Sequence, residues 1–470
     1  MTRPFIPFSI ACIFILSLIY WLYLSVATSM NIAQDSLGYA TLGKMVQTQG
    51  WVSYFTTGPN REPIYPFLIT ASMSFEHVTG LAYVKIMAFF GVMIMFLTQV
   101  LTYKILRLLN IRNGLCALVL AYLALSPALN NAAFSLYSEI AAFPVILGIV
   151  LTSFYAWEAI RQNKGQLAFV YGSILGLLLT LATLIKAVFE CITPVYLIIF
   201  FVTVLLSNKA KKMRSFPFTS LGVRMTIICF TAAVSFFYVP VTGYKWLNLH
   251  YNGNFVITNR GSWALYGNTA RRMEPLTIKR FTEALAYVPG AGVCNSIFGA
   301  KECDFWSYRK SDEFGIDKQN ELNRQHLSPE KINAALLKSS AQKALNNPLQ
   351  YTLLSVVEGS KMFFWESTQV GFVRYPHWLQ KIYDTKIFNN GLRFLVSLAT
   401  MAAVISLWRE NLTPDKSPLG FLIGVLIFLY ILFFSFFFIL TRYALAIAPL
   451  YLITISIWIN HAQSNRALRP

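Results

Sequence analysis

The stretch "FIPFSIACIFILSLIYWLYLSV" (residues 5–26), with "QDSLGYATLGK" (residues 34–44) shortly after it, decides the class of fold. The first part is an unbroken apolar run, and its length matches the roughly 20 residues that a helix needs to cross a bilayer. No small-residue cleavage site follows, so we expect a retained transmembrane helix rather than a signal peptide. The second part opens with Asp35, which places a lone carboxylate where the chain leaves the membrane.

The composition of the whole chain also indicates a membrane protein. Of the 470 residues, 56% are hydrophobic and 13% are charged, and the mean hydropathy is +0.53. These values exclude an ordinary soluble globule. Because helices satisfy their own backbone hydrogen bonds in lipid, we expect an all-α polytopic membrane protein. Ten apolar runs predict crossings at residues 5–27, 82–106, 114–129, 137–158, 167–185, 188–206, 219–241, 388–408, 418–440 and 443–460.

The net charge of +19 does not indicate nucleic acid as a partner. The basic residues gather in alternate gaps between the apolar runs, for example Lys104 with Arg112 and Arg161 with Lys164. The positive-inside rule assigns such gaps to the cytoplasm. With both chain ends also cytoplasmic, the remaining loops face outward.

The expected crossings divide the chain into three parts. Residues 1–241 form a transmembrane module that includes a first outer loop at 28–81, residues 242–387 form an outer segment, and residues 388–470 hold the last crossings. We expect the outer segment to be an ordered cap with a helix that begins after Ser328. Cys294 and Cys303 lie in this cap, and in a periplasm a disulfide between them is favoured over two free thiols.

Two outer stretches predict helices that lie on the membrane rather than across it. The residues after Asp35 have amphipathic spacing as far as Gly50, with Val46 on the lipid side. The run at residues 60–68 is too short and too interrupted by proline to cross. We therefore expect interfacial helices on the outer face.

Five ionisable residues near the bilayer carry the functional argument, because each is costly there unless it is paired or solvated. They are Asp35, Arg61, Glu139, Lys186 and Arg442. Each has a simpler reading, since Asp35 can cap a helix, Glu139 can face a helix dipole and the cations can snorkel. All five are nevertheless predicted on the same outer face, which favours one common site.

Carboxylates beside cations at the lipid boundary suit a substrate with an anionic headgroup and an apolar tail. Cations hold phosphate oxygens, and arginine offers a fork that fits them. A carboxylate near an acceptor hydroxyl can take its proton as the oxygen attacks a sugar carbon. Preorganised cations then stabilise the charge that grows on the leaving phosphate. The residue types therefore fit sugar transfer from a lipid phosphate.

The order of these residues resembles the membrane-embedded GT-C glycosyltransferases, especially the branch of protein O-mannosyltransferases and bacterial lipid A aminoarabinose transferases. The matching residues are Asp35 with Tyr39, then Arg61-Glu62-Pro63-Ile64-Tyr65-Pro66, Glu139, Lys186 with Pro194, and Arg442-Tyr443 with Pro449. The match covers residues 1 to about 206 and touches the chain again at Arg442. Ser36 stands where many members have a second acid.

The resemblance implies a GT-C-like bundle of about ten transmembrane helices with a periplasmic cap, in a bacterial cytoplasmic membrane. It implies that Asp35 is the catalytic base. It implies donor-phosphate contacts from Arg61, Lys186 and Arg442, and supporting roles for Tyr39, Glu62, Tyr65, Glu139 and Tyr443. Some relatives bind a divalent metal, so Asp35 and Glu139 are candidate metal ligands.

We therefore expect an inverting glycosyltransferase that moves a sugar from a polyprenyl-phosphate donor to a glycan, a glycolipid or a protein. The cap residues expected to shape the acceptor site, unless they pack in a core, are Trp263, Tyr266, Arg271, Arg272 and Trp306. The alternatives are a transporter or flippase, which would place its charges near the midplane, and a polymerase of lipid-linked saccharides.

Overall fold

The computed structural model of the protein describes residues 7–59, 61–210, 220–368, 371–410 and 417–467. These ranges are almost entirely helical, and a single pair of very short strands joins β1 (Ser29–Met30) to β2 (Val373–Arg374). Eight described helices are long and apolar enough to cross a membrane, or nine if one bent pair counts as a span. The protein is therefore an all-α chain built as a multi-pass membrane protein.

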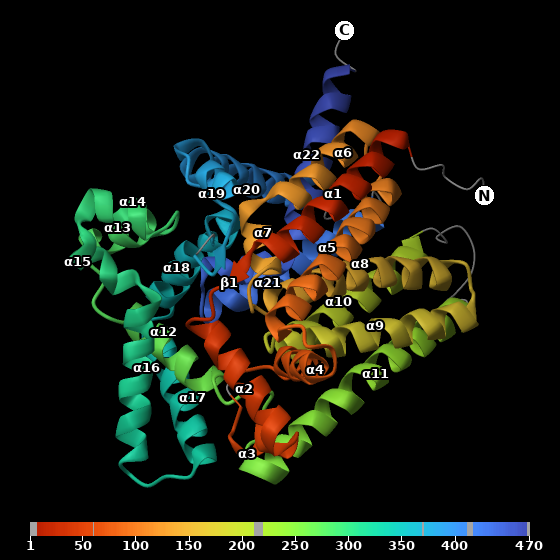
Figure 1. Ribbon diagram of the computed structural model, residues 1–470. Helices are drawn as coiled ribbons and strands as arrows, with labels where there is room; N and C mark the ends of the chain where they lie inside the picture. Colours follow the sequence, from red (N-terminus) through yellow and green to blue (C-terminus); the bar gives the residue numbers. More distant parts are fainter. Residues whose placement is uncertain (1–6, 60, 211–219, 369–370, 411–416, 468–470) are drawn as a thin grey trace.

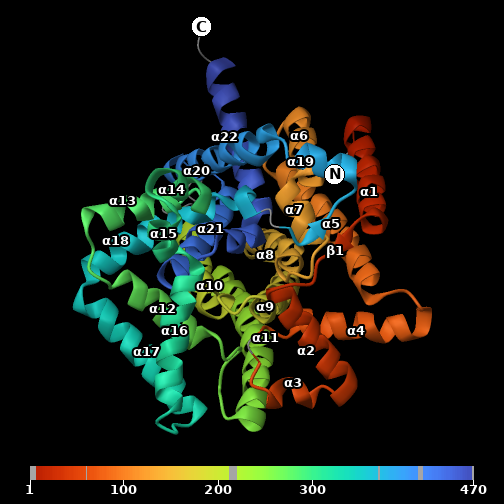
Figure 2. The same cartoon turned by 60° about the vertical axis from the view of Figure 1, so that its left-hand side comes forward.

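Most of the helices fall into three groups (Figures 1 and 2). Those able to cross a membrane are α1 (Phe8–Ala27), α5 (Tyr83–Leu108), α8 (Glu139–Arg161), α9 (Gly165–Ile185), α10 (Phe189–Ala210), α11 (Ser220–Asn252), α21 (Pro418–Phe436), and η5 (Thr441–Ile447) with α22 (Ala448–Ala467). The first connecting region holds α2 (Asp35–Gln49), α3 (Val52–Thr56) and α4 (Ile64–Thr79). The long connection holds α12 (Gly261–Arg272), α13 (Ile278–Tyr287), α14 (Ala291–Phe298), α15 (Ala300–Cys303), η1 (Asp304–Trp306), α16 (Tyr308–Asn323), α17 (Pro329–Asn346), α18 (Pro348–Gly359), η2 (Ser360–Phe363), η3 (Trp365–Thr368), α19 (His377–Tyr383) and η4 (Ile387–Leu392).

Eight of the ten expected crossings correspond to these membrane-length helices. The run expected at 114–129 is instead broken into α6 (Asn113–Leu125) and α7 (Pro127–Ala133), which meet at 54°. Proline cannot continue the backbone hydrogen bonding of the preceding helix, so the chain bends there. The run expected at 388–408 forms α20 (Arg393–Glu410), which is outside the set of membrane-length helices. The count of ten therefore stays a prediction.

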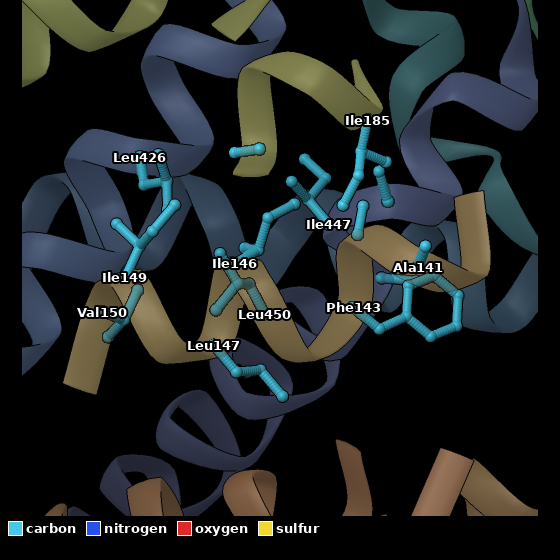
Figure 3. Close-up of a cluster of buried hydrophobic side chains, with 14 of the residues drawn as sticks. Ala141, Phe143, Ile146, Leu147, Ile149, Val150, Ile185, Leu426, Ile447 and Leu450 are labelled. Atoms are coloured by element: carbon cyan, nitrogen blue, oxygen red, sulfur yellow. The ribbon is translucent and has the colours of Figure 1, made fainter. Parts of the chain in front are cut away.

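α8 is the central helix of the bundle. Figure 3 shows its apolar side chains, among them Ile146 and Val150, beside Leu426 of α21 and Leu450 of α22. These residues are fully or almost fully buried in one continuous hydrophobic core. Because α8 is held on several sides, its first residue, Glu139, has a fixed position at one end of the bundle.

Two glycines let α9 pack directly on the backbone of α11. A Cβ atom on Gly172 would lie 2.5 Å from the carbonyl oxygen of Cys229. A Cβ atom on Gly176 would lie 2.8 Å from Cβ of Phe236 and still closer to the carbonyl oxygen of Ala233. The spacing of four residues places both glycines on one face, which is the small-residue packing typical of membrane helices.

Gly176→Ala is therefore expected to lower the stability of the protein by about 1–3 kcal/mol, because the added methyl group forces the two helices apart. The matched control is Gly243→Ala in α11, where a Cβ atom would meet nothing within 4 Å. Thermal unfolding of the purified protein in detergent measures both. Equal melting temperatures for the two variants would contradict this packing.

The stretches expected to lie on the membrane surface form α2 and α4, and neither is long and apolar enough to be a candidate span. α2 ends at Gly50 as predicted, where φ is +83°. The prediction for Val46 is wrong, because this side chain is buried in the protein rather than facing lipid. α2 packs on α4 at Gly43, where a Cβ atom would lie 3.3 Å from the Pro66 carbonyl oxygen. The two helices therefore form one unit.

The expected boundary after residue 241 falls inside α11, which continues to Asn252. Beyond it, α12 to α18 form a helical layer beside the bundle (Figure 1), and we call this layer the cap. α17 begins after Ser328, whose hydroxyl accepts a hydrogen bond from the Lys331 backbone, as predicted. A disulfide joins Cys294 of α14 to Cys303 of α15.

A buried charge cluster attaches the cap to the bundle. Glu358 of α18 accepts hydrogen bonds from Arg271, Arg272 and Lys361 at 2.5, 2.7 and 2.8 Å. Arg272 also donates to the carbonyl oxygen of Ser435 in α21 at 2.8 Å. Burial alone would raise the pKa of Glu358, but the three cations outweigh it and hold the pKa well below its usual range. One carboxylate therefore binds three buried cations.

Glu358→Gln is expected to destabilise the protein by about 3–5 kcal/mol, because it leaves buried cations without their anion. The control is Glu313→Gln, which breaks a half-exposed pair with Lys310 and should cost about 1 kcal/mol or less. Thermal unfolding compares the two variants. If Glu358→Gln unfolds no earlier than Glu313→Gln, the cluster does not hold the cap.

Candidate functional site

A cavity of about 340 Å³ lies where the bundle, the α2–α4 unit and the cap meet. Its wall contains the starts of α2, α8 and α10, the end of α21 and the first residues of η5. The cap side adds residues from the segment 256–265 and from α17. Charged residues and aromatic residues both line the cavity, so one space offers polar and apolar surface.

Asp35 is the first residue of α2 and lies at the centre of the charged part. The helix is preceded by Gln34, whose φ of +53° turns the chain sharply into α2. The Asp35 carboxylate accepts a hydrogen bond from Arg61 at 2.6 Å and a second from Arg442. The alternative of Asp35 as the N-cap is therefore wrong, because its carboxylate lies against two guanidinium groups in the cavity wall.

Local structure positions Arg61 and Arg442 on either side of this carboxylate. Arg61 comes just before α4, and the hydroxyl of Tyr54 donates to its carbonyl oxygen at 2.5 Å. The start of α2 runs beside the guanidinium, since a Cβ atom on Gly38 would lie at the ordinary contact distance of 3.6 Å from Nη2 of Arg61. Arg442 lies at the start of η5, directly after the loop that follows α21. Two distant parts of the chain thus converge on Asp35.

Arg260 is a third arginine at this carboxylate, and it was not predicted. Its Nη1 lies 3.8 Å from Oδ1 of Asp35. The segment that carries it is held by a hydrogen bond of 2.9 Å from the backbone of Asn259 to the carbonyl oxygen of Pro59. In the sequence, Arg260 is one of many cations in the 242–387 segment, and no spacing distinguishes it.

A second, deeper ion pair joins Glu139 to Lys186. Oε1 of Glu139 accepts a hydrogen bond from Lys186 Nζ at 2.9 Å, and the two side chains are only 3% and 8% exposed. Lys186 follows the last residue of α9, and Glu139 begins α8. Glu62 accepts a hydrogen bond of 3.1 Å from the backbone N–H of Ala187. The Arg-Glu-Pro element is therefore tied to the turn that carries Lys186.

Tyrosine rings fill the space between the two charged groups. The Arg61 guanidinium lies 5.5 Å from the ring centre of Tyr39, whose hydroxyl shares a hydrogen bond of 2.9 Å with Ser138. The Arg442 guanidinium lies 5.0 Å from the ring of Tyr137 and 5.7 Å from that of Tyr443. Cations over aromatic faces gain electrostatic stabilisation, so these rings help to fix the arginines.

The structure brings eight of the nine residues predicted as the base, the phosphate contacts or their supports into the wall of this cavity. Those that line it are Asp35, Tyr39, Arg61, Glu62, Glu139, Lys186, Arg442 and Tyr443. Tyr65 lies behind the wall, with its ring packed edge-on against Tyr39 at 5.2 Å. The sequence did not single out Tyr137, Glu190 or the phenylalanines that follow α21, although they also line the cavity.

The aromatic and basic cap residues expected at an acceptor site are placed differently. Arg271 and Arg272 are buried in the Glu358 cluster, and Trp306 is buried beside them with its carbonyl oxygen bound to Arg271. Tyr266 is part of a small core within the cap. None of these lines the cavity, nor does Trp263. The buried residues Tyr266, Arg271, Arg272 and Trp306 therefore pack within the protein, which was the alternative to a role at the acceptor site.

Asp35 and Glu139 were candidate metal ligands, but each carboxylate is bound to cationic side chains. In the described ranges no three His, Cys, Asp or Glu side chains gather in a way that could hold a metal ion.

The sequence matches no protein-family model and no curated protein.

Proposed function

We propose that the protein is a GT-C-like inverting glycosyltransferase that moves a sugar from a polyprenyl-phosphate donor to an acceptor hydroxyl. The observation that carries this proposal is the cluster of three arginines around Asp35. Three guanidinium groups and one carboxylate have a formal net charge of +2. This group lies in a cavity at the ends of membrane-length helices, where a lipid headgroup can enter.

The charge of the cluster suits the leaving group. The phosphate of a lipid-linked sugar is a diester with one negative charge. After sugar transfer it is a monoester, with a charge of roughly −1.5 to −2 near pH 7. Preorganised cations stabilise this added charge more in the transition state than in the ground state, which is what accelerates the reaction.

In the proposed step, the acceptor oxygen bonds to the anomeric carbon from the side opposite the phosphate. The carbon–oxygen bond to the phosphate breaks, and its electron pair remains on the phosphate oxygen. The proton of the acceptor hydroxyl passes to Asp35, which is the general base. Configuration at the anomeric carbon is therefore inverted.

Donor binding and base activation are linked in this scheme. Asp35 is bound to Arg61 and Arg442, and arginine has further donors for phosphate oxygens. Nε of Arg442 has no hydrogen-bond partner among the described residues. When the phosphate accepts hydrogen bonds from the guanidinium groups, the carboxylate loses some of its own contacts with these cations. It then becomes a stronger base.

The apolar part of the cavity suits the first units of a lipid tail. Its members are Val188, Leu265, Leu337, Phe434, Phe437 and Phe438. They come from the turn before α10, the cap and the region at the end of α21. A substrate with phosphate at the arginines and hydrocarbon at these side chains matches both surfaces at once.

The proposed setting is a bacterial cytoplasmic membrane with the cavity facing the periplasm. Arg161 and Lys164 lie at the ends of α8 and α9 that are remote from Glu139 and Lys186, as the positive-inside rule requires. The acceptor in this proposal is a glycan, a glycolipid or a protein, and the cap covers the outer side of the site.

A transporter or flippase, or a polymerase, of lipid-linked saccharides is the rival function. Mass spectrometry of surface glycans from cells with and without the protein separates these functions. Transfer predicts the loss of one sugar residue, restored by the wild-type gene and not by Asp35→Asn. Loss of a whole polymer, or no change in any glycan, would contradict the proposal.

A further inference from the structure

Among the polar groups of the cavity wall that lack the partners buried groups normally have, two lie close together in the chain. Oε2 of Glu139 and the hydroxyl of Tyr137 are buried and have no hydrogen-bond partner among the described residues. Glu139 is 2% exposed and Tyr137 is 5% exposed. Both residues line the cavity. A buried carboxylate oxygen or hydroxyl without a hydrogen bond costs free energy. A group with a purely structural role is therefore expected to have a hydrogen-bond partner within the protein.

A purely structural ion pair does not account for both groups. Lys186 donates to Oε1 of Glu139 at 2.9 Å, which neutralises the carboxylate but leaves Oε2 without a donor. The ring of Tyr137 supports Arg442, but this contact does not use the hydroxyl. The two unpartnered groups belong to the same short stretch of chain, at the start of α8.

The side chain of Tyr137 lies beside the arginine cluster. The guanidinium of Arg442 lies 5.0 Å from the ring centre of Tyr137 and 5.7 Å from that of Tyr443. Lys186 Nζ lies 5.7 Å from the same Tyr443 ring. A sugar bonded to a phosphate at Arg442 would therefore be next to the side chain of Tyr137.

We propose that Glu139 and Tyr137 form the subsite that selects the donor sugar through its hydroxyl groups. One sugar hydroxyl donates to Oε2 of Glu139, and another pairs with the Tyr137 hydroxyl. A neutral hydroxyl fits better than an ammonium group, because Lys186 already neutralises the carboxylate and a further buried cation would have no anion. This inference rests on the proposed function and names the donor as a neutral, hydroxyl-bearing sugar.

The test measures donor binding through the reactivity of Cys191, an exposed free thiol in the cavity wall. The full chain in detergent is treated with a maleimide in the presence of polyprenyl phosphate, polyprenyl-phosphate-linked neutral hexoses, or their monodeoxy and amino counterparts. The variant Cys191→Ser shows which labelling comes from this thiol. Protection by each lipid gives its relative affinity.

For the wild type, one polyprenyl-phosphate hexose should protect at about tenfold lower concentration than one of its monodeoxy analogues or its amino counterpart, since all three carry the same phosphodiester and a hydrogen bond to a buried charged group contributes that much or more. Tyr137→Phe should reduce this advantage severalfold and leave protection by polyprenyl phosphate unchanged. Glu139→Gln should remove the advantage. Tyr137→Phe breaks no described hydrogen bond, so it keeps the test valid even if Glu139→Gln fails to fold.

Two results would overturn the inference in different ways. If polyprenyl phosphate protects but no hexose protects better than its monodeoxy and amino counterparts, or both variants keep the full advantage, the subsite is wrong and the phosphate site stands. If polyprenyl phosphate gives the wild type no protection, the proposed function fails and the subsite fails with it.

Discussion

Asp35→Asn is expected to reduce sugar transfer by about 10²–10⁴-fold, the usual contribution of a general base, while the protein stays folded. Asparagine has nearly the same shape and keeps a carbonyl oxygen for Arg61 or Arg442, but it cannot accept the acceptor's proton. Initial rates with a saturating polyprenyl-phosphate sugar measure the effect on turnover, and thermal unfolding verifies the fold.

Donor binding gives this variant a second readout. Without the carboxylate, the arginines have no competing anion, so polyprenyl phosphate should protect Cys191 at an equal or lower concentration than in the wild type. Asp35→Glu keeps a base in a shifted position and should retain part of the activity. Wild-type turnover in Asp35→Asn would refute the assignment of the base.

Arg442→Gln is expected to lower turnover by about 10²–10³-fold, which is the cost of removing one preorganised donor from a developing oxyanion. Arg442→Lys keeps the charge but loses the fork, so it should recover only part of the rate. Arg260→Gln should have a smaller effect, because Arg260 lies 3.8 Å from Asp35 and makes the most distant of the three contacts.

The matched control for these variants is Arg309→Gln. Arg309 is 67% exposed on α16 and pairs with Asp304, outside the cavity. It changes the net charge of the protein by the same amount and should leave turnover unchanged. Equal losses in Arg309→Gln and Arg442→Gln would show that total charge, rather than the position of the guanidinium, sets the rate.

Much of the bundle could be predicted because a membrane span needs a long apolar run, and such runs are visible directly in a sequence. The apolar runs do not show where a helix continues past the membrane. α11 continues through the polar residues up to Asn252 because packing against α3 and the following segment supports it. The break at Pro127 was missed because the run is apolar on both sides of the Ser126-Pro127 pair.

The candidate site could be predicted in part because buried or interfacial charges are rare in membrane proteins, so Asp35, Glu139 and Lys186 stood out against apolar surroundings. The same reasoning fails in the cap, where charged residues are common. Arg260 reaches the cavity and Arg272 packs in a core, yet only tertiary contacts distinguish them. These two arginines thus differ in role because different parts of the chain pack against them.

The most direct test is a cryo-electron microscopy map of the full protein with bound polyprenyl phosphate. Our account predicts a phosphate density within hydrogen-bonding distance of Arg61 and Arg442, with the Asp35 carboxylate released from at least one of them and the lipid tail beside the phenylalanines after α21. A phosphate bound elsewhere, at the bilayer midplane or at the opposite ends of the helices, would contradict it.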